Sequence, residues 1–250
     1  MSAKKSLFRY LSLRSYLRIH YLLFRLSYRV GLLKSIPEYK YHYFIKSIIK
    51  KGDCVVDIGA NLGYFSVLFA ELTKPDGLVV SIEPVPIFFE VLSSNLKKYS
   101  HCVLYRCALG LENRKVQLTL PSNSGYLRTG IASISENSVN NLTDKFCFEA
   151  DMKIGSELLN NLNKIDYIKC DVEGYEKYVL PELKGIIEKH LPILQIEIWG
   201  ENKKVIFELM ESLGYERFSL IKGKLFKDLL SEKDLGDFLF IHKSKNILLN

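Results

Sequence analysis

An acidic residue and two glycines stand close together where a predicted strand turns into a predicted helix. Asp57 lies two residues before Gly59, and Gly63 follows after three residues that include Asn61. The run from Cys54 to Ile58 is largely apolar and β-branched, as in a strand covered on both faces, and the glycines permit a sharp turn. Helical apolar spacing follows directly. A strand, a glycine turn and a helix with free N–H groups form a cleft for a polar ligand.

The spacing of the glycines indicates which ligand this turn binds. A dinucleotide site has three glycines spaced G-x-G-x-x-G so that the backbone approaches a pyrophosphate, whereas this turn has two spaced G-x-x-x-G. The carboxylate of Asp57 is poorly placed to hold a phosphate, but it suits a ligand with an ammonium or sulfonium charge. We therefore predict S-adenosylmethionine as the cofactor. An NAD-dependent oxidoreductase is the alternative that the missing third glycine disfavours.

A second acidic residue, Glu83, supports the same cofactor. It follows the apolar run Leu78–Ile82 and lies twenty-four residues after Gly59, near the position at which a nucleotide-binding sheet places the carboxylate for the ribose hydroxyls. Either acid alone could cap the next helix, but the two in this order and spacing favour a cofactor site. Small residues from Ala108 to Gly110 follow the next strand and would let a flat adenine ring lie against the backbone.

Three further carboxylates stand at the ends of predicted strands and are candidates for catalysis. Asp171 and Glu173 follow the run from Ile165 to Cys170, and Glu197 ends a later apolar run. A methyl group leaves a sulfonium by in-line displacement, so the protein must align an acceptor oxygen and accept its proton. We predict that Asp171 lies beside the transferred methyl group and that Glu173 or Glu197 shares the role of proton acceptor. The alternative for Glu173 is capping of the helix that begins at Tyr175.

The close pair Asp171 and Glu173 could also hold a divalent cation through oxygen ligands. We predict no metal site, because no further Asp or His stands near the pair in the sequence. The histidines His101 and His190 are expected at the surface or at helix ends, without a catalytic role.

Strands and helices alternate along most of the 250-residue chain, which predicts an α/β fold with a doubly wound, mostly parallel sheet. The composition, 48% hydrophobic and 25% charged, is ordinary for a globular enzyme. Helices are predicted at 38–50, 64–72, 84–98, 154–162, 175–189 and 202–213. Strands are predicted at 54–58, 78–82, 102–107, 165–170 and 191–198, with a closing antiparallel pair at 217–225 and 237–242.

The segment 115–149 interrupts this alternation. It is polar and rich in turn residues, and Val116 to Leu120 alternates as an exposed strand does. A long segment of this kind is a mobile loop or a substrate-binding lid. We predict a lid, because the segment follows the strand that would border the active site.

The net charge of +7 belongs to the first 36 residues, which we treat as a basic helical extension of a methyltransferase domain at 37–250. Eight of the 35 basic residues precede the first acid, Glu38, so the remaining 27 are balanced by 28 acidic residues. On a helix, Arg14, Arg18, Arg25 and Arg29 form one stripe, while Leu13, Leu17, Phe24 and Tyr28 face another side. The longest uncharged run, 19–24, is far too short to cross a membrane.

This basic helix has three interpretations. It packs its aromatic face on the domain, which we slightly favour; it lies on an anionic membrane surface; or it is a transit peptide. A membrane-surface or nucleic-acid-binding protein that works through this helix is the second alternative to an enzyme. The near-neutral remainder of the chain argues against nucleic acid as a partner. We expect a small-molecule or glycan acceptor, with residues 1–36 as the candidate membrane contact.

Five cysteines without a C-x-x-C pair indicate free thiols, three of them in apolar strand-like runs. We expect a reduced, cytoplasmic protein without structural zinc, with the basic helix as its candidate contact to the inner face of a membrane.

Five segments in order resemble the landmarks of the FkbM-type methyltransferase family, within the class I S-adenosylmethionine-dependent methyltransferases. They are 57–63, 82–84, 108–110, 168–174 and Glu197, and the resemblance covers roughly three quarters of the chain. It implies a seven-stranded, mostly parallel sheet whose last strand is antiparallel. It also implies that Asp57, Gly59, Asn61 and Gly63 line the methionine end of the cofactor, Glu83 the ribose and Ala108 the adenine. Members typically methylate a hydroxyl on a sugar, glycolipid or polyketide.

Overall fold

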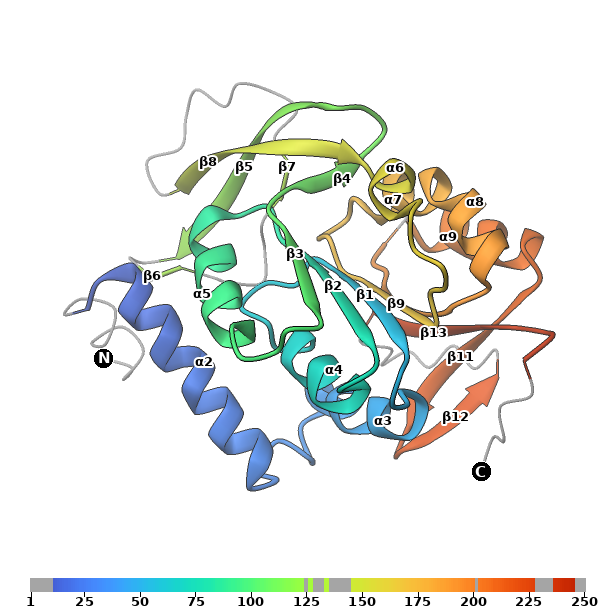
Figure 1. Cartoon of the computed structure of the whole chain (residues 1–250), viewed down its shortest axis with the longest axis horizontal. Helices are drawn as coiled ribbons and strands as arrows, with labels where there is room; N and C mark the ends of the chain where they lie inside the picture. The colour runs from blue at the N-terminus through green and yellow to red at the C-terminus, as the bar shows by residue number, and fades with distance from the viewer. Residues whose placement is uncertain are drawn as a thin grey trace.

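The computed structural model describes residues 11–123, 126–127, 133–134, 145–200, 202–227 and 236–245. Within these ranges the chain forms an eight-stranded sheet in the middle of the molecule and a smaller sheet at one edge of it (Figure 1). Helices cover both faces of the larger sheet, so the predicted doubly wound α/β architecture is confirmed.

The strands of the central sheet run in the order β12-β11-β13-β10-β9-β1-β2-β3. Five neighbouring strands, from β3 to β10, are parallel, and β13 lies antiparallel between β10 and β11. The bounds are β1 (Cys54–Ile58), β2 (Leu78–Ile82), β3 (Cys102–Tyr105), β9 (Tyr167–Cys170), β10 (Ile193–Glu197), β11 (Tyr215–Ile221), β12 (Lys224–Lys227) and β13 (Asp237–His242).

The eighth strand, β12, is an addition to the seven that were predicted. The sequence suggested one strand over 217–225, but the chain reverses at Lys222 and Gly223, whose φ angles are 50° and 78°. The residues after this turn pair back on β11 as an antiparallel hairpin. The positive φ angles at two successive positions are the physical reason that one predicted strand became two.

The helices divide between the two faces of the central sheet. Those of the amino-terminal part cover the face on which Val55 and Tyr167 point, and those of the carboxyl-terminal part cover the face of Val56 and Ile168 (Figure 1). The first group is α2 (Leu13–Arg29), the short 3-10 helix η1 (Pro37–Tyr39), α3 (Lys40–Ile48), α4 (Ser66–Thr73) and α5 (Pro86–Leu96). The second group is α6 (Gly155–Leu159), α7 (Glu176–Glu182), α8 (Lys184–His190) and α9 (Asn202–Ser212).

The described part of the 115–149 segment is a sheet, so the prediction of a loop-rich insertion was wrong there. The long strands β5 (Arg114–Asn123) and β8 (Lys145–Ile154) pair antiparallel, and β4 (Ala108–Gly110), β6 (Tyr126–Leu127) and β7 (Ser133–Ile134) complete the smaller sheet. Residues 124–125, 128–132 and 135–144 lie outside the described residues. The lid therefore stays a prediction.

The expectation that Val116 to Leu120 is an exposed strand was also wrong. Val116, Leu118 and Leu120 are buried and join the same hydrophobic cluster as α2 and α5. Alternation in sequence shows that one face of a strand is apolar, and here that face packs on the main domain. The smaller sheet thus forms one wall of the molecule above α5 (Figure 1).

The predicted amino-terminal helix is present as α2 and packs its aromatic side on the domain. Tyr21, Phe24 and Tyr28 are buried and belong to the main hydrophobic cluster. Of the four arginines in the predicted stripe, Arg25 is buried, at 8% exposed, and forms a 2.7 Å ion pair with Glu71 of α4. Among the described residues, no helix is long and apolar enough to cross a membrane.

Candidate active site

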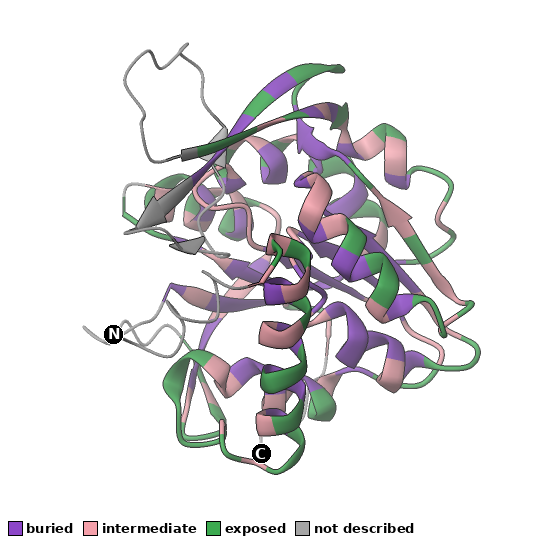
Figure 2. Ribbon diagram, turned by 90° about the vertical axis from the view of Figure 1, so that its left-hand side faces the viewer, coloured by how far each residue is buried: buried purple, intermediate pink, exposed green. Residues whose placement is uncertain are grey.

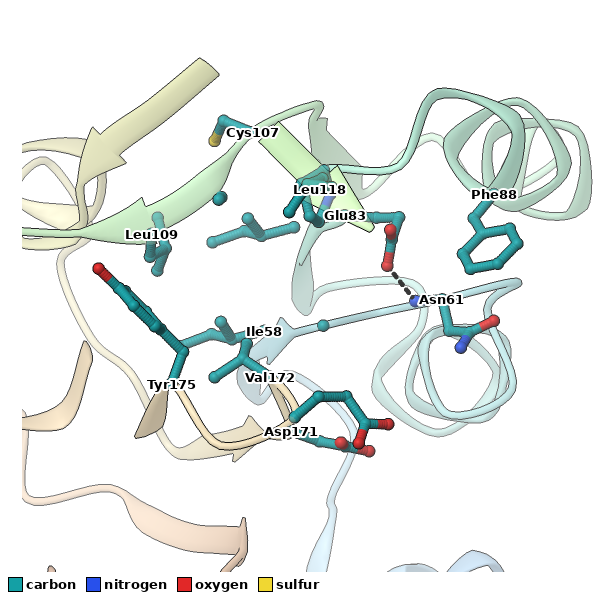
Figure 3. Close-up of a pocket in the computed structure, with 15 residues that line it drawn as sticks. Ile58, Asn61, Glu83, Phe88, Cys107, Leu109, Leu118, Asp171, Val172 and Tyr175 are labelled. Atoms are coloured by element: carbon teal, nitrogen blue, oxygen red, sulfur yellow. Dashed lines mark hydrogen bonds between the residues drawn. The ribbon is translucent and has the colours of Figure 1, made fainter. Parts of the chain in front are cut away.

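A pocket lies at the carboxyl edge of the central sheet, where β1, β2 and β9 end beneath the smaller sheet (Figure 3). Six of the nine residues predicted for the site line it: Gly59, Asn61, Glu83, Ala108, Asp171 and Glu173. Its other walls are largely apolar and include Phe88, Cys107, Leu118 and Tyr175. The pocket therefore combines carboxylates on one side with surfaces suited to a flat, apolar group on the other.

The turn after β1 depends on backbone conformations that favour glycine. Gly59 and Gly63 have φ angles of 81° and 91°, and Asn61 between them has 52°. A Cβ atom on Gly59 would lie 1.8 Å from the backbone oxygen of Asp171. Gly59 is therefore required because the ends of β1 and β9 approach closely, as well as for the turn.

Glu83 connects the turns that follow β1 and β2. Its Oε2 accepts a hydrogen bond from the backbone N–H of Asn61 at 2.7 Å (Figure 3). Its Oε1 accepts one from the backbone N–H of Val85 at 2.8 Å. Burial raises the pKa of Glu83 to about 7, although these two N–H groups oppose the shift. Each carboxylate oxygen has a further lone pair, so the side chain retains acceptor capacity for a ligand hydroxyl.

Asp57 lies behind the turn and is not part of the pocket wall. Its side chain is buried, Oδ2 accepts a 2.5 Å hydrogen bond from the Ser66 hydroxyl, and Oδ1 has no hydrogen-bond partner among the described residues. Burial raises the pKa of Asp57, and Lys169 and Ser66 oppose this. Asp57 thus holds the start of α4 against the end of β1. Gly63, also predicted for the site, likewise shapes the turn without lining the pocket.

Asp171, Glu173 and Glu197 form a cluster of carboxylates at the pocket edge. One oxygen from each lies within 4.8 Å of the others. Glu197 joins the cluster because β10 pairs in parallel with β9, so both strands end at the same edge of the sheet. The sequence alone left Asp171 and Glu173 without a third ligand. The structure supplies one, so the metal alternative gains a possible donor set of three carboxylates.

The ammonium of Lys169 stabilises the charged form of Asp171 in this carboxylate cluster. Its Nζ lies 2.8 Å from Oδ2 of Asp171, and its side chain is 5% exposed. Burial by itself would raise the pKa of Asp171, but Lys169 and a hydrogen bond with Glu197 outweigh burial and hold that pKa below its ordinary value. Burial and the neighbouring Asp171 charge raise the pKa of Glu197 to about 10 and that of Glu173 to about 8. Asp171 is therefore the member of the cluster whose charged form its neighbours favour.

The turn that carries Glu173 is stabilised by another acid. Oε1 of Glu176 accepts hydrogen bonds from the N–H groups of Val172 and Gly174, at 2.9 and 3.2 Å. Glu173 itself has a φ of 54° and lines the pocket. Glu176, the first residue of α7, thus ties the preceding turn to the start of the helix, and no side-chain capping hydrogen bond is present at the N-cap residue Tyr175.

Lys169 is the functional residue that reasoning from the sequence missed. It is paired in register with Asp57 on one side and Gln195 on the other, so that a row of buried polar residues crosses the sheet below the pocket. A charged residue inside the apolar strand Tyr167–Cys170 was a usable signal. His42 lies on the same side, with its ring centroid 3.8 Å from that of Phe65 and the two rings tilted by 31°. Burial together with Lys169 lowers the pKa of His42 to about 3, and nothing in its sequence context indicated this.

A profile of the methyltransferase FkbM domain matches residues 57–217, a range that contains the turn after β1, Glu83 and all three carboxylates. Methyltransferase sdnD of Sordaria araneosa is 28% identical over 193 residues, which cover 65% of this chain and 73% of that protein. Protein-L-isoaspartate O-methyltransferase of Methanopyrus kandleri is 27% identical over 93 residues, or 37% of this chain and 41% of that protein.

A solved structure has the same fold. The structure titled methyltransferase FkbM, from Methylobacillus flagellatus KT, superposes with a TM-score of 0.52 at 17% identity, covering 96% of this chain and 58% of that chain. At this level of identity the likeness concerns the fold.

Proposed function

The chain belongs to the FkbM methyltransferase family, and from this premise we propose that it transfers a methyl group to a hydroxyl oxygen on a sugar, glycolipid or polyketide-like acceptor. It is an S-adenosylmethionine-dependent methyltransferase. The observation that carries the hydroxyl assignment is the group of three carboxyl side chains at the pocket edge, with the ammonium of Lys169 2.8 Å from Oδ2 of Asp171.

The residues of the pocket fit the cofactor. Glu83 offers acceptor lone pairs for the ribose hydroxyls, and the apolar wall at Cys107, Ala108 and Leu118 suits the adenine. Asn61 and Gly59 line the pocket on the side of the turn. When bound, S-adenosylmethionine supplies an electrophilic methyl group on a sulfonium sulfur. We assign Gly59, Asn61, Glu83 and Ala108 to direct contact with it, and Asp57 and Gly63 to holding the turn.

The carboxylate cluster suits an acceptor that must lose a proton. A hydroxyl oxygen becomes positively charged as it forms a bond to carbon, so a carboxylate that takes its proton in the transition state accelerates the reaction. We assign this role to Asp171, because Lys169 keeps it ionised. The raised pKa values of Glu173 and Glu197 favour their protonated forms, which can donate hydrogen bonds to other acceptor oxygens.

A carboxylate acceptor, as the name of the isoaspartate methyltransferase relative indicates for that protein, is disfavoured here. Such an acceptor is already ionised and needs no base. It would also have to approach the Asp171 carboxylate, and like charges at a site reject a ligand. A neutral hydroxyl meets no such repulsion.

The cofactor assignment is tested by calorimetric titration with S-adenosylhomocysteine. We expect Glu83→Gln to weaken binding by about tenfold or more, because an amide replaces one acceptor oxygen with a donor. Glu112→Gln is the matched control, since its side chain is 67% exposed on another turn. Equal affinities of the two variants for S-adenosylhomocysteine would show that Glu83 does not contact the cofactor.

The reaction is tested with radiolabelled S-adenosylmethionine and separate panels of hydroxyl, amine and carboxylate acceptors. We expect transfer to hydroxyl compounds, and a rate about 100-fold or more lower in Asp171→Asn with cofactor affinity retained. Asp76→Asn is the control, because Asp76 pairs with Lys51 at the surface. Transfer confined to amines or carboxylates, or full activity of Asp171→Asn, would contradict the proposal.

A further inference from the structure

The outward face of α2 carries a row of exposed apolar side chains. Leu22, Leu23, Leu26 and Val30 are 59–69% exposed, and Leu32 just after the helix is 68% exposed. Their spacing places the first four on one side of the helix, opposite the aromatic residues that pack on the domain. Figure 2 faces this side of the molecule, and α2 lies at the front with much of its surface exposed.

Single exposed leucines are ordinary on a protein surface, but a contiguous group of them marks a binding surface. This group is bordered by positive charge. Arg18 and Arg29 are exposed and flank the leucines along the same helix. No acidic residue occurs between Met1 and Ser35. An apolar strip with a basic border is the pattern of a helix that lies in the interface of an anionic membrane.

A basic cavity opens at the carboxyl end of the same strip. It measures about 350 Å³, and its lining has the basic side chains of Arg25, Arg29, Lys34 and Lys46 and the one carboxylate of Glu71. Val30 lines this cavity and also belongs to the apolar strip, so the two features adjoin.

The charges in this cavity are incompletely paired. Nη2 of Arg25 donates to Glu71 Oε1 at 2.7 Å, while its Nη1 is buried and has no partner among the described residues. Arg29 approaches the same Glu71 oxygen at 3.7 Å. The cavity thus has four basic side chains and one carboxylate in its lining, which suits an anionic ligand of the kind that arginine and lysine hold together, such as a phosphate group.

We propose that α2 and the turn after it bind an anionic phospholipid membrane, with the leucine strip in the acyl boundary and a lipid phosphate in the basic cavity. The leucine strip and the basic cavity fit the same ligand, because acyl chains and headgroup phosphates adjoin in a bilayer just as the strip and the cavity adjoin here. A second copy of the chain fits less well, since a two-fold interface would bring the same basic border against itself.

The test uses the full chain and sedimentation with vesicles. We expect it to pellet with vesicles of phosphatidylcholine and phosphatidylserine, and to stay in the supernatant with phosphatidylcholine alone. Binding should fall as salt is raised, because the headgroup attraction is screened. Equal binding to both vesicles, or none to either, would overturn the proposal.

Two pairs of variants separate the strip from the cavity. Leu22→Gln/Leu26→Gln removes apolar contact, and its control is Leu111→Gln/Val205→Gln, at side chains that are also exposed. Lys34→Glu/Lys46→Glu changes the cavity, and its control is Lys184→Glu/Lys204→Glu on α8 and α9, across the molecule from α2 (Figure 1).

We expect each strip or cavity variant to lose affinity for the anionic vesicles while its control keeps it. The loss of two cations alone corresponds to about 25-fold. Circular dichroism checks that all four variants are folded. The proposal fails if the strip or cavity variants bind like their controls. It also fails if sedimentation velocity shows a dimer of the chain that Leu22→Gln/Leu26→Gln dissociates, because the strip would then be covered by a second copy.

Discussion

The ammonium nitrogen of Lys169 lies 2.8 Å from Oδ2 of Asp171, although Lys169 is buried in the sheet and Asp171 faces the pocket. The two residues stand two positions apart at the end of β9, so their side chains project to the same side. The charge of the proposed proton acceptor therefore depends on a residue that is not part of the pocket wall. This arrangement leads to the first prediction.

Replacing Lys169 by methionine should slow methyl transfer and shift its pH dependence. Without the cation, the pKa of Asp171 rises, so the acidic limb of the rate profile should move to higher pH. We expect kcat to fall about tenfold or more near pH 7, with cofactor affinity less affected. Lys204→Met, at an exposed position on α9, is the control. An unchanged acidic limb in Lys169→Met would mean that Lys169 does not set the charge of Asp171.

The stability of the ligand-free protein should decrease as pH rises from 6.5 to 8. The pKa values of Glu83, Glu173 and Glu197 are raised to about 7, 8 and 10 from an ordinary 4.5. In this range the unfolded chain has released these protons, while the folded chain retains part or all of them. The free energy of unfolding therefore falls with increasing pH. His42 acts oppositely, but only below about 6.5, because its folded pKa is about 3.

Urea titrations at pH 6.5 and 8 measure this slope. In Glu197→Gln we expect the free energy of unfolding to fall less steeply with pH, by about 1 kcal/mol per pH unit. The reason is that the folded variant no longer retains the proton of Glu197. Glu211→Gln is the control, because Glu211 is exposed on α9. A stability that rises from pH 6.5 to 8 would contradict the assigned directions.

Gly59→Ala should destabilise the protein far more than Gly52→Ala. Both glycines have φ angles above 80°, so both substitutions place a Cβ in the left-handed region at a cost of about 1 kcal/mol. At Gly52 no atom lies within 4 Å of the added Cβ, whereas at Gly59 the Asp171 oxygen would be 1.8 Å away. The difference between the urea midpoints of the two variants measures the cost of the contact between the added Cβ and the Asp171 oxygen. Similar midpoints would show that the ends of β1 and β9 can separate without cost.

Incubating the protein with EDTA and then removing the EDTA should leave the rate of methyl transfer unchanged. Asp171, Glu173 and Glu197 have the spacing of a divalent-cation site, but Lys169 already forms an ion pair with Asp171, and the raised pKa values of the other two carboxyl groups favour their protonated forms. A cation would have to displace both the ammonium and the protons. Activity that is lost on chelation and restored by Mg²⁺ or Mn²⁺ would instead establish the metal alternative.

Much of the fold could be predicted from local patterns. The β-branched runs at Cys54–Ile58 and Leu78–Ile82 are strands, the glycine turn between them is where it was expected, and Glu83 follows β2 as the spacing required. These features are local, because a strand, its turn and the next helix are encoded within about twenty residues. Right-handed crossovers then left few ways of arranging the parallel strands.

The smaller sheet and the hairpin of β11 and β12 show where local patterns were insufficient. Alternation from Val116 to Leu120 correctly indicated a strand, but it could not show that the rest of the domain covers its apolar face. The same holds for α2. The sequence identified its aromatic side and its arginines, whereas the burial of Arg25 against Glu71 and the exposure of Leu26 depend on where α4 lies.

The sequence by itself determined the order of the landmarks, the strand-turn-helix unit that begins at Cys54, and the acids that could act on a cofactor and an acceptor. The tertiary structure alone decided which acids meet. Glu197 reaches Asp171 because β10 lies beside β9, and Lys169 stabilises the charged form of Asp171 because both are held at the end of one buried strand. Periodicity reports which residues share a face, but charge states depend on distances between strands and on burial, which only packing sets.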